Sequence, residues 1–222
     1  RMAAARKLLM HEGHMTYSQV LAERLELRHR SGSSSFAWEG EASTGTDVSR
    51  FVLETEGDAK LGKALEEGEI QAKWRRAINP WFNAEFGLRQ DLVGPARTYL
   101  TAGVEGLLPY WIETQALVFV SNKGDVHARL ELETDQRITQ RLVLQPSAEI
   151  EVAFQDVREL GITSPIPEWA IGARLRYEIQ PYFAPYIGVE RRKEHTGSQE
   201  HSASGGRSFA STNVLLGLRA WF

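Results

Sequence analysis

The chain has 222 residues, of which 42% are hydrophobic and 25% are charged, and its formal net charge is -3. Because this charge lacks the basic excess of nucleic-acid-binding proteins, we expect no nucleic-acid partner. A transmembrane helix needs about 20 consecutive apolar residues, and the best candidate stretch, 106–122, is interrupted by Pro109, Glu113 and Gln115.

The first segment, residues 1–16, has no alternating pattern and contains every methionine of the chain. Its opening residues resemble the interior of a longer chain, so we expect a mature or shortened N-terminus. Two thioethers and two imidazoles lie within six residues, at Met10, His11, His14 and Met15. Soft sulfur selects Cu(I), and imidazole suits copper generally, so these four residues are the candidate copper site. The alternative is a terminal tail that merely contains them.

From Tyr17 onward, short runs alternate apolar and polar residues with a period of two, which is the pattern of half-buried β-strands. We predict twelve such strands, at about 17–30, 36–43, 50–56, 69–75, 82–91, 99–105, 112–120, 126–133, 138–155, 169–178, 182–192 and 207–222. The run 138–155 keeps one parity across Pro146, which favours one long strand there. In the last run Val214, Leu216 and Leu218 alternate with polar residues, and we expect this strand to close against 17–30.

Alternation alone fits either a strand of a soluble β-sandwich or a strand of an outer-membrane barrel. The connections distinguish the two folds. Tight turns are predicted near 44–47, 79–80, 109, 134–137 and 180–181, and the longer loops lie between them, including a charged loop at 59–68. Short turns at one end, long loops at the other and an even strand count are typical of outer-membrane barrels. We therefore predict an all-β fold, an antiparallel transmembrane β-barrel of about twelve strands with both termini on the short-turn, periplasmic side.

In this barrel the apolar parity faces lipid and the charged parity fills the lumen. Aromatic residues near strand ends form the expected girdles: Trp38, Trp74, Phe82, Trp169, Phe183 and Phe222. The inward parity contains more acids than bases, which predicts a path that attracts cations. The predicted acidic path consists of Glu26, Glu56, Glu85, Asp91, Glu105, Glu131, Glu149 and Glu178. The alternative is that paired charges simply fill the lumen, as side chains do in small barrels.

Signals for catalysis are weak. The chain contains neither a Gly-x-Ser-x-Gly elbow nor a His-Glu-x-x-His pair. His127 lies at lumen parity near Glu131 and Glu133, where it is a weaker metal ligand than the N-terminal four, and it has no evident serine partner. We therefore expect no enzyme, with a hydrolase at the barrel rim as the remote alternative.

Several blocks of the sequence resemble the copper resistance protein B family of outer-membrane proteins. They are 55–57, 103–111, 123–126, 142–146, 175–179 and 183–189, and they keep the family's order over about residues 17–222. The resemblance implies a single barrel in the outer membrane of a Gram-negative bacterium, with a role in periplasmic copper resistance. Family members usually carry a longer Met- and His-rich region before the barrel, of which 10–15 is a remnant.

The residues and the resemblance together predict two parts. Residues 1–16 form a short Met/His segment, a tail or partial plug of the barrel, and residues 17–222 form the barrel with a charged lumen. The expected function is to bind copper ions and to pass or sequester them at the outer membrane. The expected partners are the lipid bilayer, copper ions and periplasmic copper proteins. A narrow non-selective cation pore, or a purely structural barrel, remains the alternative.

Overall fold

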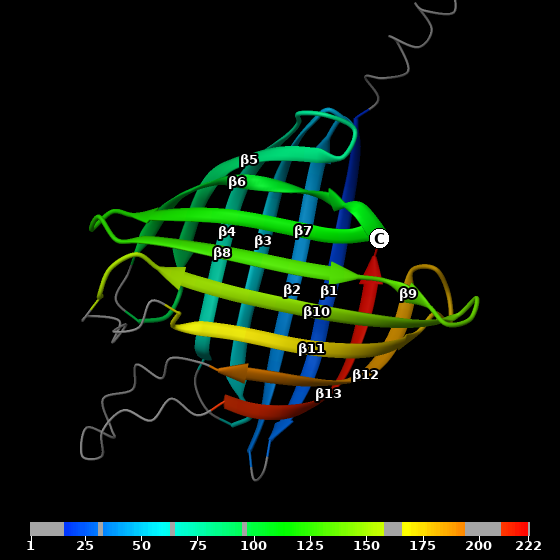
Figure 1. The fold of residues 1–222 in the computed structure, drawn as a ribbon. Helices are drawn as coiled ribbons and strands as arrows, with labels where there is room; N and C mark the ends of the chain where they lie inside the picture. The colour runs from blue at the N-terminus through cyan, green and yellow to red at the C-terminus, as the bar shows by residue number, and fades with distance from the viewer. Residues whose placement is uncertain are drawn as a thin grey trace, which may run out of the picture.

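The computed structural model describes residues 16–30, 33–62, 65–94, 97–157, 166–193 and 210–221. These residues form a closed antiparallel barrel of twelve long strands, with one further two-residue strand, β9, beside β10 (Figure 1). The strands are β1 (Tyr17–Arg30), β2 (Ser33–Gly45), β3 (Ser49–Lys60), β4 (Leu65–Ala77), β5 (Phe82–Asp91), β6 (Thr98–Leu108), β7 (Ile112–Ser121), β8 (Val126–Thr134), β9 (Gln136–Arg137), β10 (Leu142–Ala153), β11 (Glu168–Tyr177), β12 (Phe183–Lys193) and β13 (Ala210–Trp221). The predicted fold class is confirmed.

Closure comes from the pairing of β13 with β1, which joins the two ends of the sheet. Leu27 pairs with Leu216, and His29 pairs with Val214. Because the sheet closes on itself, all twelve long strands have a partner on both sides. The predicted closing contact between the last and first strands is confirmed. Among the described residues, no helix is long and apolar enough to cross a membrane.

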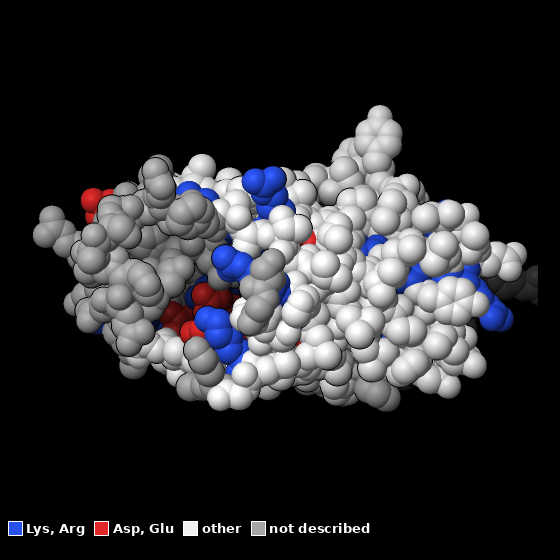
Figure 2. Space-filling view, turned by 90° about the horizontal axis from the view of Figure 1, so that it is seen from below, with Lys and Arg blue, Asp and Glu red and all other residues white. Residues whose placement is uncertain are grey.

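The two faces of the wall have opposite chemistry, and the apolar face is the outer one. On the outside, Leu100 is 61% exposed and Ile187 is 58% exposed, whereas inside the barrel Lys73 is 0% exposed. The view from below shows a wall mostly free of charge, with acidic side chains in a hollow bordered by basic ones (Figure 2). A soluble sandwich would bury its aliphatic side chains and expose its charges. The inverted arrangement requires lipid around the barrel.

One strand departs from the predicted parity. A β-bulge lies between Ala22 and Arg24, where β1 pairs with both β2 and β13. The extra residue shifts the side chains on one side of the bulge to the other face of the sheet. Leu21 therefore lies on the lumen side, opposite Glu41, although its spacing from Leu25 and Leu27 predicted the lipid side.

The connection between β3 and β4 is shorter than the charged loop predicted at 59–68. β3 continues to Lys60 and β4 begins at Leu65, so only 61–64 connect them, and Lys60 forms an ion pair with Glu66. The charged residues of 59–68 lie mostly in the ends of β3 and β4. From the sequence pattern alone, such strand ends look the same as a loop. The long connections are 154–167 and 194–209, both at the end opposite the short turns.

The predicted long strand across Pro146 is confirmed as β10, although 138–141 form a turn before it. The register explains why proline is tolerated. Pro146 pairs with Ala173 of β11 on one side. On the other side the pairing with β8 ends at Ser147, and the pairing with β9 begins only at Leu144. Proline thus occupies a gap in the ladder, where no partner strand needs its missing N–H group.

Aromatic side chains gather at the short-turn end. Trp81, Tyr110, Trp111 and Tyr182 are exposed there, as expected of an interfacial girdle. Tyr110 and Trp111 occupy the β6–β7 turn, η1 (Pro109–Trp111), with left-handed φ values of 68° and 61°. Among the predicted girdle residues, Trp38 instead lies within β2 and covers Gly57 of β3, and Phe222 lies outside the described residues.

Candidate functional site

The lumen is lined by networks of ion pairs that join neighbouring strands and, in places, strands further apart in the wall. In the first network, Lys73 and Arg75 of β4 share the carboxylate of Glu85, at 3.3 Å and 2.7 Å. Lys73 also contacts Glu54 at 2.7 Å, and Arg75 contacts Glu105 at 2.5 Å. The strand alternation places each of these side chains on the inner face, where the low dielectric strengthens their attraction.

The second network surrounds Glu69 of β4. Arg89 contacts Glu69 at 2.8 Å, and Arg129 of β8 donates two hydrogen bonds of 3.3 Å to it. Both guanidinium groups stack against Phe119, at 5.0 Å and 5.5 Å from its ring centre, and Arg89 also stacks against Tyr99. Tyr99 of β6 and Phe119 of β7 thus provide aromatic faces against which the arginines pack inside the lumen.

The third network is the most deeply buried. Glu26 of β1 accepts hydrogen bonds from Arg28 at 2.8 Å, from Arg174 at 3.0 Å and from the Tyr186 hydroxyl at 3.1 Å. Arg174 also reaches Glu190 at 3.5 Å. These contacts satisfy the charge of Glu26 completely, so it is a structural carboxylate and not an exposed ligand.

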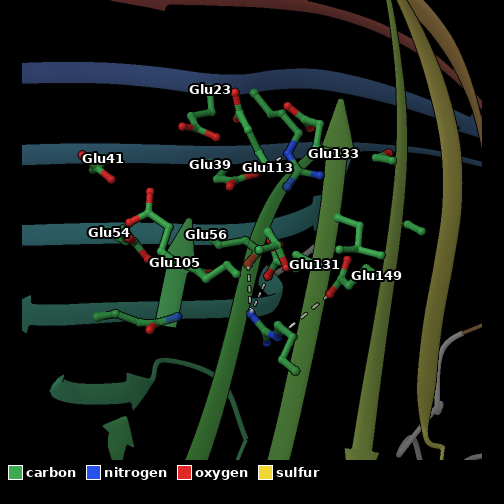
Figure 3. A pocket seen from close by; sticks show the side chains of 18 of the residues that line it. Glu23, Glu39, Glu41, Glu54, Glu56, Glu105, Glu113, Glu131, Glu133 and Glu149 are labelled. Carbon is green, nitrogen blue, oxygen red and sulfur yellow. Dashed lines mark hydrogen bonds and ion pairs between the residues drawn. The ribbon is translucent and has the colours of Figure 1, made fainter. Parts of the chain in front are cut away.

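A first cavity, of about 380 Å³, lies toward the short-turn end of the lumen. Only three arginines, Arg24, Arg75 and Arg129, line it among the described residues, against twelve glutamates. Figure 3 shows ten of these glutamates turned into the same space from seven strands: Glu23, Glu39, Glu41, Glu54, Glu56, Glu105, Glu113, Glu131, Glu133 and Glu149. Glu23 and Glu113 have no ion pair or hydrogen bond with any other described residue. The cavity therefore presents a large excess of carboxylates.

A second cavity, of about 250 Å³, lies toward the opposite end and includes Glu66, Glu67 and Val93 in its lining. A third space, of about 320 Å³, opens at the short-turn mouth between Arg176, Arg219 and Trp221. Here Arg176 contacts Asp135 at 2.6 Å, and Arg137 contacts Glu178 at 3.1 Å. The charges at the mouth are thus nearly balanced, whereas the two cavities within the lumen are acidic.

The eight acids of the predicted path lie in four different settings. Glu56, Glu105, Glu131 and Glu149 come together in the first cavity, and Asp91 lines the second. Glu26 and Glu85 are fully buried within ion pairs, and Glu178 forms a rim pair. The spacing missed Glu23, because the bulge in β1 turns it into the lumen; an interruption of alternation at 21–25 is the only signal in the sequence.

His127 is 4% exposed and faces the inner side of β8. Its Nδ1 lies 3.3 Å from Glu151, and its ring meets Tyr99 edge-on. Within the described ranges, no three His, Cys, Asp or Glu side chains are arranged to hold a metal ion. Met10, His11, His14 and Met15, and with them the predicted segment 1–16, lie outside the described residues.

The model of one protein family, described as copper resistance protein B precursor, matches residues 16–222. The chain belongs to the copper resistance protein B family. It is 35% identical to copper resistance protein B of Escherichia coli over 214 residues, covering 96% of this chain and 72% of that protein. It is 32% identical to a homolog from Pseudomonas syringae pv. tomato, covering 96% and 74%. The family suggested by the sequence blocks is confirmed.

Solved structures agree on the fold. The NanC porin matches with a TM-score of 0.57 at 10% identity, and covers 92% of this chain and 99% of its own. The KdgM porin matches with a TM-score of 0.55 at 11% identity and the same coverage. Together with the family, these barrels place the protein in the outer membrane of a Gram-negative bacterium, in copper resistance. The family description indicates a resistance protein.

Proposed function

We propose that this barrel binds copper ions and passes them through, or holds them in, its acidic lumen. The observation that carries the proposal is the first cavity, where carboxylates far outnumber guanidinium groups. An acidic cleft with low-dielectric walls concentrates cations. Oxygen and imidazole ligands both suit Cu(II), and unpaired carboxylates such as those of Glu23 and Glu113 have oxygens available to a passing ion.

The N-terminal segment extends this proposal. Met10, His11, His14 and Met15 would capture copper near the short-turn end and deliver it to the cavity, as a tail or partial plug. Thioethers bind Cu(I), and imidazoles bind either oxidation state. His127, whose Nε2 has no hydrogen-bond partner among the described residues, is the weaker candidate ligand within the lumen. Periplasmic copper proteins are the proposed exchange partners.

Copper flux into liposomes tests the role of the cavity. The double variant Glu23→Gln and Glu113→Gln removes two carboxyl groups from the cavity without disturbing an ion pair, so copper flux should fall about tenfold. Asp47→Asn, in the exposed short turn between β2 and β3, removes one charge that does not line the cavity and should leave flux unchanged. Zinc and sodium are measured beside copper. Equal flux in the double variant would refute the cavity, and equal permeability to sodium and copper would identify a non-selective cation pore.

Metal analysis of the purified protein tests the N-terminal ligands separately. Replacing Met10, His11, His14 and Met15 with serine should abolish tight copper binding, because no described group of side chains forms a replacement site. The matched control is His127→Gln, which should retain most of the copper. Bound copper that survives the fourfold replacement would show that the N-terminal segment is not the capture site.

A further inference from the structure

The first and second cavities lie next to each other in the lumen. The residues that line both cavities form the boundary between them. Six residues border both spaces: Arg24, Glu39, Glu56, Glu69, Arg129 and Glu149. We call this set the charged septum. Arg24 and Glu39 form an ion pair on one side of it, and Arg129 lies at its centre. An ion that moves between the cavities must pass these side chains.

Arg129 crosses the lumen from one wall to another. It belongs to β8, whereas its bidentate partner Glu69 belongs to β4, with β5, β6 and β7 between them in the wall. The same guanidinium approaches Glu56 of β3 at 3.5 Å, and it approaches Glu151 and Glu149 of β10 at 3.8 Å and 4.0 Å. One side chain therefore connects four strands across the barrel.

Arg129 is held more tightly by Glu69 than by its other carboxylate neighbours. This difference indicates how the septum would open. The two bonds to Glu69 and the stacking on Phe119 hold the guanidinium on the β4–β7 side. The contacts with Glu56 and Glu149 are longer than hydrogen bonds, and the buried Nε atom has no acceptor. Glu56 and Glu149 are thus the carboxylates that a competing cation can take from Arg129 at least cost.

We propose that Arg129 is the residue that limits and selects ion passage through this barrel. With its guanidinium in place the two cavities are separated by a positive charge. A cation crosses by replacing the guanidinium at Glu56 and Glu149, while Glu69 keeps Arg129 against the wall. The charge at a constriction governs which ions conduct, so this one residue sets the selectivity of the whole path. The identification of copper as the physiological ion rests on the proposed function; the septum itself does not.

Single-channel conductance in potassium chloride tests the septum. Arg129→Gln removes the charge and shortens the side chain, so conductance should rise about twofold or more, with a higher ratio of potassium to chloride permeability. Arg137→Gln is the matched control, because Arg137 is 61% exposed at the rim, and it should conduct as the native protein does. If Arg129→Gln and native protein have the same conductance and the same ion preference, Arg129 is not the constriction.

A second measurement does not depend on the Arg129 variant. The chain contains no cysteine, so a single introduced thiol can be labelled selectively. Asn83→Cys places a thiol in the first cavity, and Val93→Cys places one in the second. In membranes, a cationic methanethiosulfonate added at the short-turn side should label only the first, and added at the other side only the second. Labelling of both thiols at equal rates from either side would overturn the septum even if Arg129→Gln fails to fold.

The two proposals can fail separately. Native protein that conducts potassium but carries no more copper than sodium would refute copper selectivity and leave the Arg129 result valid. Native protein that carries copper while Arg129→Gln changes neither conductance nor ion preference would refute the septum alone.

Discussion

At the scale of single residues, Glu26 illustrates how a fully buried charge is held inside the barrel. Its carboxylate is 0% exposed, and its three donors come from β1, β11 and β12. A buried ion pair is a weak source of net stability, because desolvation offsets much of the attraction. Removing the Glu26 carboxylate is nevertheless strongly destabilising, because its arginine partners keep their charges inside the barrel.

We therefore predict that Glu26→Ala lowers the free energy of unfolding by about 3–5 kcal/mol, because it leaves Arg28 and Arg174 without their shared carboxylate. Urea unfolding of the barrel in detergent micelles measures the change. Glu178→Ala, which removes the partner of the exposed Arg137, should cost less than about 1 kcal/mol. Equal losses for the two variants would contradict the distinction between buried and rim pairs.

The sequence predicted which face of the sheet each glutamate occupies better than it predicted which residues each glutamate contacts. The inward parity of Glu56, Glu105, Glu131 and Glu149 followed from alternation alone, because each strand has a fixed period of two. Their separation from Glu26 and Glu85 could not be predicted. Whether a lumen carboxylate is buried or faces a cavity depends on arginines from strands across the barrel, and no local spacing encodes those contacts.

At the scale of elements, the pairing of β12 with β13 depends on one glycine. Gly217 lies directly opposite Tyr186, and a Cβ at Gly217 would come within 2.4 Å of the tyrosine ring and 2.5 Å of its hydroxyl. The ring occupies the space above the glycine and from there reaches Glu26. The strand pair thus positions a hydrogen-bond donor for a carboxylate on β1.

Gly217→Ala should destabilise the barrel by about 1–3 kcal/mol, because the added methyl group displaces a packed ring. Heat-induced unfolding followed by gel mobility measures this effect. Gly40→Ala is the control, since its Cβ would approach no atom closer than 3.4 Å, and its stability should match that of the native protein. A normal stability for Gly217→Ala would mean that Tyr186 has another position available.

The elements also show where sequence patterns stop being informative. The strand across Pro146 was predictable because its parity does not change along the run. The bulge in β1 was not, because one inserted residue between Ala22 and Arg24 looks the same in sequence as an irregular strand. The loop predicted at 59–68 was wrong for a related reason: polar residues at strand ends beyond the lipid resemble loop residues.

At the scale of the whole molecule, the fold class followed from features that act over the full chain. An even number of strands, apolar residues on one parity and short turns at alternate connections together require a barrel in lipid. The cavities and the septum do not follow from these features, because barrel diameter and the lengths of side chains decide which opposite walls meet. Composition predicted an acidic lumen, whereas only the structure locates Arg129 within it.

The seam between β1 and β13 has a consequence for how the protein is made. Leu21 and Trp221 are paired across it, and a contact between residues roughly 200 positions apart must await nearly the whole chain. Until β13 arrives, β1 and the growing edge expose unpaired backbone groups that invite association with other chains. Closure of the barrel is therefore a late event, and a chain interrupted before β13 cannot close through this pairing.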